Sequence, residues 1–251
     1  MTHDRKDRIR SGANEPATQV LDAAGLRRRF AVFGHYYRCR LDDREWDCRS
    51  VLELVAPHRV PANADGLLGL VPDLVAVMMN PGGSRPLDSG WEPPLISGFP
   101  LLPGVCRLVS ARPDTTQYQI MRVLVARGWH HARVVNLSDL RQAKSPLFLQ
   151  AAAQLEAQPG GRVHSLFSPE RQKERNWLLP AGRTPIILGW GRSRGLMPLA
   201  RQAMAALAGR ALAGVFPPGE DCLCAHPSPQ LQRLKEAWLE AILERLATMV
   251  G

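Results

Sequence analysis

The sequence is poor in lysine, and this scarcity determines the character of its charge. Only four of the 32 basic residues in the 251-residue chain are lysines, so arginine supplies almost all of the net charge of +9. Arginine binds phosphate through paired hydrogen bonds and stacks on bases, which favours a polyanionic partner such as nucleic acid. A GC-rich coding sequence, which enriches arginine together with alanine, glycine and proline, would produce the same bias without a binding role.

Metal-binding and several catalytic patterns are also missing. The chain has no P-loop, no nucleophile elbow, no carboxylate pair at glycosidase spacing and no His/Cys cluster suited to metal-assisted hydrolysis. The cysteines include no Cys-x-x-Cys pair, so we expect free thiols at Cys39, Cys48, Cys106, Cys222 and Cys224. We therefore expect neither a metal nor an organic cofactor.

Long apolar runs are absent as well. No stretch approaches the ~20 apolar residues of a membrane span, and Met1–Pro16 is polar, without the apolar core of a signal peptide. We expect a cytoplasmic, soluble protein without a membrane partner.

The composition is sufficient for one large domain, since 45% of the residues are hydrophobic. We expect a flexible lead-in over residues 1–29, and a hairpin with a linker, packed on the main domain, over residues 30–70. The catalytic domain is expected over residues 71–251. Two runs rich in aromatic and β-branched residues, Phe30–Leu41 and Trp46–Val55, predict the hairpin.

Beyond residue 70, short apolar runs alternate with segments that carry helix signals. The expected strands are Leu74–Met79, Ala132–Asn136, Pro185–Trp190 and Cys222–Ala225. The expected helices run from Thr115 to Gly128, Ser168 to Leu179, Pro198 to Leu207 and Leu231 to Met249. Such alternation predicts a mostly parallel sheet between helical layers, with one functional face at the carboxyl ends of the strands.

The turn Asn80-Pro81-Gly82-Gly83 is the most informative local feature. Pro81 fixes its own φ and pushes Asn80 out of the helical region, while the two glycines let the backbone approach a ligand closely. Taken alone, the same turn could simply end a strand.

Parallel strands would bring this turn together with other polar strand ends. Asn136, Trp190-Gly191 and His226 each follow or end one of the expected strands, and would meet Asn80 at one edge of the sheet. Two amides and one imidazole in a cleft can orient a water molecule and read the edge of a base. Alternatively, His226 could be a buried capping histidine and Asn136 could cap a turn.

The residues around these positions resemble motifs of the uracil-DNA glycosylase superfamily, and in particular its mismatch-specific and thymine-DNA-glycosylase-like branch. The resemblance covers about residues 73–235 and rests on four short motifs in the same order: Met79-Asn80-Pro81-Gly82, Val134-Val135-Asn136, Leu188-Gly189-Trp190-Gly191 and His226-Pro227-Ser228-Pro229. The chain is also similar to a bacterial family of unknown function. The residues that match it are a Tyr-Arg-x-x-Leu hairpin and an Asn-Leu-x-x-Leu-Arg run, here Tyr37–Leu41 and Asn136–Arg141.

The resemblance implies a three-layer α/β/α sandwich around a four-stranded mostly parallel sheet, extended by the N-terminal hairpin. It also implies a monofunctional DNA glycosylase that flips a base into the cleft. Asn80 would then position the hydrolytic water, His226 would stabilise the leaving base and Asn136 would select the base. Phe99, or failing that Trp91, would stack on the base. Phosphate contacts would fall to Ser84, Arg192, Arg194, Ser228 and Arg233. No lysine lies in the four motifs, which argues against Schiff-base chemistry.

Two departures from the family pattern bear on specificity and on base flipping. Uracil-specific members carry a Tyr at the position of Gly82, where the ring blocks pyrimidines substituted at carbon 5. Gly82, with Gly83 beside it, removes that barrier. We therefore expect a 5-substituted base such as thymine or a modified cytosine, for example from phage DNA, ahead of uracil. Gln230 stands where the inserting Leu would be, with Leu231 one place later.

Three classes of function stay open at this point. The first is the glycosylase, a monomer without an obligatory protein partner that acts on duplex or single-stranded DNA. The second is a noncatalytic nucleic-acid-binding module of the same fold. The third is a hydrolase or transferase acting on free nucleotides, which the excess of arginine disfavours.

Overall fold

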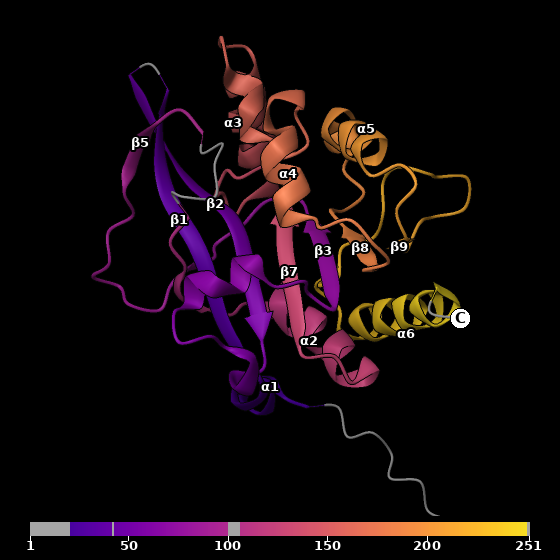
Figure 1. Ribbon diagram of the computed structural model, residues 1–251. Coiled ribbons are helices and arrows are strands. Elements are labelled where there is room, and N and C mark those ends of the chain that lie inside the picture. Colours follow the sequence, from indigo (N-terminus) through magenta and orange to yellow (C-terminus); the bar gives the residue numbers. More distant parts are fainter. Residues whose placement is uncertain (1–20, 42, 100–105, 250–251) are drawn as a thin grey trace, which may run out of the picture.

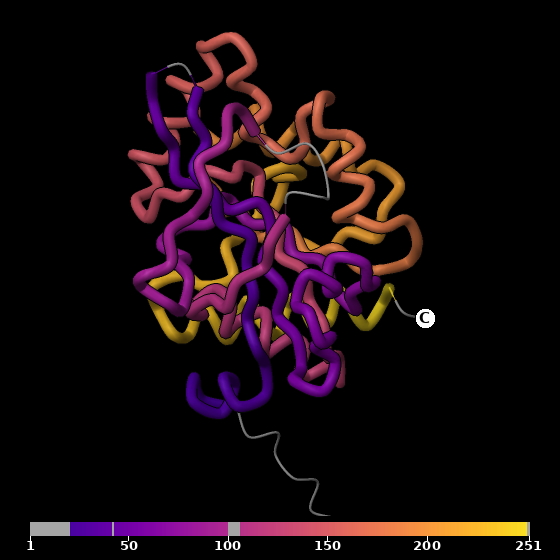
Figure 2. Tube along the Cα trace, turned by 60° about the vertical axis from the view of Figure 1, so that its left-hand side comes forward, coloured from indigo at the N-terminus to yellow at the C-terminus, as the bar shows by residue number. Residues whose placement is uncertain are grey.

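The structure is a computed structural model that describes residues 21–41, 43–99 and 106–249 (Figure 1). Of the expected lead-in, residues 1–20 lie outside the described residues, whereas Ala23–Arg29 forms helix α1. Asp22 caps α1 by accepting a hydrogen bond from the backbone nitrogen of Gly25, and Leu26 is fully buried. The described end of the lead-in therefore packs on the fold, beside the start of β1 (Figures 1 and 2).

The predicted hairpin is confirmed, but its place in the fold differs from the expectation. Strands β1 (Ala31–Leu41) and β2 (Arg44–Val55) pair antiparallel, with an irregularity between His35 and Tyr36. β2 also pairs antiparallel with β7 (His131–Asn136). The hairpin that was expected as an extension is therefore an integral part of a larger, mixed sheet.

The described residues form an α/β fold around a mixed sheet of nine strands. Its order is β4-β6-β1-β2-β7-β3-β8-β9, with β5 paired to β1. The remaining strands are β3 (Leu74–Met78), β4 (Arg85–Pro86), β5 (Leu95–Ser97), β6 (Val109–Arg112), β8 (Ile186–Gly189) and β9 (Leu212–Gly214). Four neighbours, β7, β3, β8 and β9, run parallel, and their carboxyl ends point to the upper side of Figure 1.

The strand expected over Cys222–Ala225 was wrong. This segment makes only an isolated antiparallel bridge, between Cys224 and Gly191, and β9 takes the place beside β8. The carboxylate of Glu220 accepts hydrogen bonds from the backbone nitrogens of Cys222 and Leu223, so a turn rather than a sheet ladder binds these groups.

The helices follow signals that the sequence carries locally. α2 (Thr115–Arg127) begins at a capping box between Asp114 and Gln117 and ends at Gly128, whose φ of 66° is left-handed. The other helices are α3 (Ser145–Glu156), α4 (Gln172–Leu178), α5 (Met197–Ala206) and α6 (Gln232–Met249). Among the described residues there are also short 3-10 turns: η1 (Pro57–Arg59), η2 (Ala64–Gly69), η4 (Gly161–His164), η5 (Pro169–Arg171) and η6 (Arg194–Leu196). None of the described helices combines the length and the apolar character needed to cross a bilayer.

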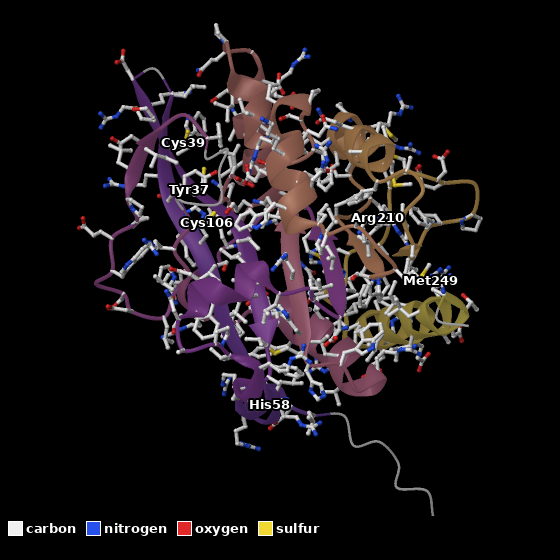
Figure 3. All side chains as sticks on the ribbon, in the orientation of Figure 1. Tyr37, Cys39, His58, Cys106, Arg210 and Met249 are labelled. Carbon is white, nitrogen blue, oxygen red and sulfur yellow. The ribbon has the colours of Figure 1, made fainter. Side chains whose placement is uncertain are left out.

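Helices cover both faces of the central strands. Alternate side chains of β3 belong to two different hydrophobic clusters, because successive residues of a strand point to opposite faces. One cluster takes in residues of α3, α4 and α5, and the other takes in residues of α1, α2 and α6. Tyr37, Cys39 and Cys106 lie in the first, and Met249 packs against the second (Figure 3).

A buried ionic network joins the hairpin to the parallel strands. Glu53 of β2 accepts a hydrogen bond from Arg133 Nε of β7 at 2.6 Å, and it lies 2.7 Å from His131 Nε2. Arg133 also donates to the carbonyl oxygens of Leu178 and Leu67. A buried charge is costly unless its hydrogen-bonding groups are paired. This network therefore fixes how β2 lies against β7, and thus where β2 meets the site.

Candidate active site

A cleft of about 560 Å³ opens where the parallel strands end. The register pairs Met78 of β3 with Asn136 of β7 and with Gly189 of β8, so the residues that follow these positions meet. The cleft is lined by eight of the residues expected in the site: Asn80, Gly82, Gly83, Asn136, Arg192, His226, Ser228 and Gln230.

Asn80 follows β3 and is held by the backbone. Its amide nitrogen donates to the carbonyl oxygens of Leu140 at 3.1 Å and Gln142 at 2.7 Å. Both amide hydrogens are used in this way, so Oδ1 is the part of the amide left for a ligand. A fixed acceptor of this kind can hold a water molecule by one of its hydrogens.

The segment that holds Asn80 is anchored in the interior. Asp139 is fully buried; its carboxylate accepts a hydrogen bond from the Tyr37 hydroxyl at 2.7 Å and pairs with Arg171 at 2.8 Å. Burial raises the pKa of the Asp139 carboxyl, and the positive charge of Arg171 opposes that shift. These bonds anchor Asp139, which directly precedes Leu140, one of the two residues whose carbonyl oxygens hold the amide of Asn80.

His226 presents a defined tautomer. The backbone nitrogen of Ser228 donates to His226 Nδ1 at 3.1 Å, so in the neutral ring the proton is on Nε2. Burial lowers the pKa of His226 below the ordinary value of 6.5. The imidazole is therefore neutral near pH 7, with its Nε2 hydrogen left to donate to a ligand in the cleft.

Close packing positions the loop that carries His226. A Cβ on Gly189 would lie 2.8 Å from Pro227 Cδ and 2.9 Å from Met78 Sδ, so only glycine permits this approach to β8. Gln119 of α2 is buried and donates to the carbonyl oxygens of Pro227 at 3.2 Å and Lys235 at 2.9 Å. The side chain of Gln119 therefore ties the His226 loop to the start of α6.

Asn136 lies fully buried at the floor of the cleft. Its hydrogen-bonding pattern assigns the amide: the nitrogen donates to the carbonyl oxygen of Asn80, and the oxygen accepts from Arg49 Nη2, both at 3.2 Å. One amide hydrogen and one oxygen lone pair are left, so Asn136 keeps both a donor and an acceptor.

The glycines of the turn leave space in the cleft. Gly82 has a φ of 60°, a conformation that other residues adopt only with strain, and a Cβ placed on it would meet no atom within 4 Å. A Cβ placed on Gly83 would have the Cβ of Ala143 as its nearest atom, at 3.9 Å, so there is space at this position as well.

Five residues expected in the site are not in the lining of the cleft. Ser84 is buried, with its hydroxyl 2.8 Å from that of Tyr36. Phe99 is buried edge-on against Tyr37, with 6.5 Å between the ring centroids. Arg194 lies outside the lining, paired with Glu220, and Leu231 and Arg233 are exposed. Trp91, the second candidate for stacking, also lies elsewhere, beside Pro86 and Val109.

The structure adds residues that sequence reasoning did not place in the site. Arg49 comes from the middle of β2, while Asp114, Thr116 and Gln117 come from the start of α2. The residues of α2 had a signal in the sequence, because the capping box between Asp114 and Gln117 indicates that a helix begins there. No local signal marked Arg49, because its position depends on the pairing of β2 with β7.

A second, smaller cavity adjoins the cleft. It has a volume of about 380 Å³ and shares Gly191, Arg192 and His226 with the cleft, while Trp238 and Leu234 of α6 supply apolar walls. Among the described residues, no three His, Cys, Asp or Glu side chains are grouped so that they could hold a metal ion. The five cysteines are free and buried.

Comparisons of the chain with protein-family models, with curated proteins and with solved structures found no match.

Proposed function

We propose that the protein is a monofunctional DNA glycosylase that hydrolyses the N-glycosidic bond of a flipped-out pyrimidine and leaves an abasic site. The observation that carries the proposal is the pairing of two complementary groups in one cleft. The amide nitrogen of Asn80 is bonded to backbone carbonyl oxygens, which leaves its Oδ1 free to accept a hydrogen bond. Nδ1 of His226 accepts from the backbone of Ser228, which leaves its Nε2–H free to donate one. Hydrolysis at a sugar carbon requires a positioned water on one side and stabilisation of the departing base on the other.

In the proposed reaction, Asn80 Oδ1 accepts a hydrogen bond from water and directs its oxygen toward C1′ of the sugar. The C1′–N1 bond breaks with both electrons passing to the base, and the water oxygen bonds to C1′. His226 Nε2–H donates a hydrogen bond to a carbonyl oxygen of the base, where negative charge develops. A neutral imidazole suits this role, since it donates this hydrogen bond while its proton stays on the ring.

The proposed substrate carries a substituent at carbon 5. The cleft volume of about 560 Å³ falls within the ~300–1,000 Å³ of pockets that enclose sizeable ligands, and is more than an unmodified pyrimidine requires. The open space at Gly82 and Gly83 agrees with thymine or a modified cytosine. Plain uracil would leave this space unfilled.

The absence of lysine from the described lining supports a hydrolytic rather than a lyase mechanism, because Schiff-base chemistry needs an amine. The lining also supports DNA as the substrate. Arg192, Ser228 and Gln230 lie at the cleft, and exposed Arg233 lies close by in the sequence. We assign phosphate contacts to Arg192 and Arg233, with Arg194 joining if its pair with Glu220 opens.

We further propose that β7, β3, β8 and β9, with helices on both faces, form the three-layer core of the glycosylase superfamily. The parallel pairing of these strands and the site at their carboxyl ends support this assignment. The hairpin β1–β2 then extends the core sheet on the β7 side and contributes Arg49 to its cleft.

The test is excision from defined oligonucleotides. Single- and double-stranded oligonucleotides bearing uracil, mismatched thymine, or hydroxymethylated or glucosylated cytosine are incubated with the protein and then cleaved with alkali at abasic sites. We expect cleavage of a 5-substituted substrate by the wild-type protein and none by Asn80→Ala. Asn63→Ala is the matched control, because Asn63 only caps the turn η2. The absence of abasic product from every substrate would refute the proposal.

A further inference from the structure

Arg49 is a buried cation whose hydrogen-bonding groups are largely unused. It lies in the cleft lining and is only 2% exposed. Nη2 donates to the amide oxygen of Asn136, while Nε and Nη1 have no hydrogen-bond partner among the described residues. The other two large buried guanidinium groups, those of Arg133 and Arg171, are paired with carboxylates.

Such an arrangement is unfavourable for the protein alone. A guanidinium does not lose its proton under ordinary conditions, so it cannot escape burial by becoming neutral. Burial lowers the pKa of Arg49, and the nearby Tyr36 and Asp114 oppose that shift only in part. Unpaired donors on a buried charge are costly, and a residue of this kind at the wall of a cavity is best explained by a ligand that completes its bonds.

We infer that Arg49 contacts the flipped base and stabilises the negative charge that the base acquires as it leaves. This inference rests on the proposed function, and it adds a catalytic residue from the hairpin to the pair Asn80 and His226. As the C1′–N1 bond breaks, its two electrons spread over the carbonyl oxygens and nitrogens of the ring. Arg49 donates to one of these atoms at the floor while His226 donates to another.

Atoms and charge balance in this step. The attacking water gives its oxygen to C1′ and one proton to solvent, and the released base takes one proton from solvent after it departs. Arg49 keeps its protons throughout. Its contribution is a fixed positive charge held at a buried position, where electrostatic stabilisation is stronger than in water.

The inference predicts a dependence on the leaving base that a structural role would not produce. The assay compares kcat and KM for the excised base and for the same base carrying a more electron-withdrawing substituent, such as fluorine, at carbon 5. For Arg49→Met we expect kcat to fall on the order of 10²–10³-fold, as for the loss of one preorganised donor. The loss is smaller for the electron-poor base, which needs less stabilisation. Arg49→Lys keeps the charge and loses less than Arg49→Met.

Two controls separate this role from packing and from DNA binding. Arg192→Gln removes one positive charge from the cleft without touching the floor, so it raises KM by the same factor for both bases. The Tm of Arg49→Met should equal or exceed that of the wild type, since an unpaired buried charge is replaced by an apolar side chain of similar length. An equal loss of kcat for both bases, or a lowered Tm that accompanies the loss, would overturn the inference.

A binding experiment distinguishes failure of this inference from failure of the proposed function. Barbiturate, a pyrimidine ring that is anionic at neutral pH, and uracil, which is neutral, are titrated into wild-type protein and Arg49→Met. We expect tighter binding of barbiturate by the wild type and loss of that preference in the variant. If no oligonucleotide is cleaved but the preference is found, Arg49 binds an anionic pyrimidine ring as inferred, and it is the glycosylase reaction that is refuted. If the wild type shows no preference, the assignment of Arg49 is wrong.

Discussion

Replacing Asn80 by aspartate exchanges the amide nitrogen for an oxygen, and should turn two favourable hydrogen bonds into repulsive contacts. The amide nitrogen of Asn80 donates to the carbonyl oxygens of Leu140 and Gln142 at 3.1 and 2.7 Å. In Asn80→Asp an ionised oxygen would face both carbonyl oxygens without any hydrogen to share. Each lost hydrogen bond contributes about 1 kcal/mol net. Repulsion at these distances adds to that loss, so we expect the free energy of unfolding to fall by about 2–3 kcal/mol at pH 7.

The pH dependence of this loss follows from the same contacts. Two carbonyl oxygens stabilise the protonated carboxyl, so the pKa of the new aspartate is raised in the folded protein. A group with a raised folded pKa is most compatible with folding at low pH, and its destabilising effect grows as the pH rises through that pKa. The deficit of Asn80→Asp should therefore shrink in acid, where the carboxyl donates one of the two bonds.

The assay is urea denaturation from pH 4 to pH 8, with kcat/KM measured in parallel. Asn63→Asp is the matched control, because Asn63 uses only its side-chain oxygen, which accepts from the backbone nitrogen of Asp65. Its stability should change by no more than about 0.5 kcal/mol. If Asn80→Asp were as stable as Asn63→Asp at pH 7 and also more active than the wild type, the assigned rotamer of Asn80 would be wrong.

Three further predictions follow from the loops and the interior. The activity profile should be flat across pH 6.5 and decline only below it, because burial lowers the pKa of His226. An inflection in kcat/KM above 6.5 that is absent from His226→Gln would contradict the neutral state assigned to this imidazole. Gly189→Ala should reduce kcat/KM at least about tenfold, since its Cβ displaces Pro227, and an unchanged rate would show that the loop position is unimportant. Burial lowers the pKa of His35 to about 4, below its unfolded value. The neutral His35 ring therefore contributes its full stabilisation above pH 6.5, and the free energy of unfolding falls by about 3 kcal/mol as the pH drops toward 4. Urea denaturation at a series of pH values should show a weaker pH dependence of the free energy of unfolding in His35→Gln than in the wild type. The same pH dependence in both proteins would refute this assignment.

Elements with strong local signals could be predicted from the sequence. The capping box at Asp114 and the left-handed Gly128 mark both ends of α2, and two runs rich in aromatic and β-branched residues indicate the paired strands β1 and β2. The pairing of β2 with β7 could not be predicted, because it joins segments about eighty residues apart through buried ionic contacts such as Glu53 with Arg133. The short apolar run Cys222–Ala225 has the character of a strand, but the hydrogen bonds that its backbone donates to Glu220 form a turn instead.

The candidate site was predictable where it depends on strand ends. Asn80 and Asn136 end or follow parallel strands, so a parallel sheet alone brings them together. Phe99 could not be placed, because its packing against Tyr37 is a tertiary contact without a local pattern. Arg49 was missed for a related reason: within β2 it is one more residue of an alternating strand, and only the assembled sheet turns it toward the cleft.

The most direct test of the central claim is mass spectrometry of both reaction products. An oligonucleotide with one thymine mismatch or one modified cytosine is incubated with wild-type protein or Asn80→Ala, and the free base and the abasic strand are quantified. The account predicts equal molar amounts of the two products from the wild type. It also predicts neither product from Asn80→Ala, although that variant still binds the oligonucleotide. Release of the same products by Asn80→Ala at the wild-type rate, or no release of any base by the wild type, would contradict it.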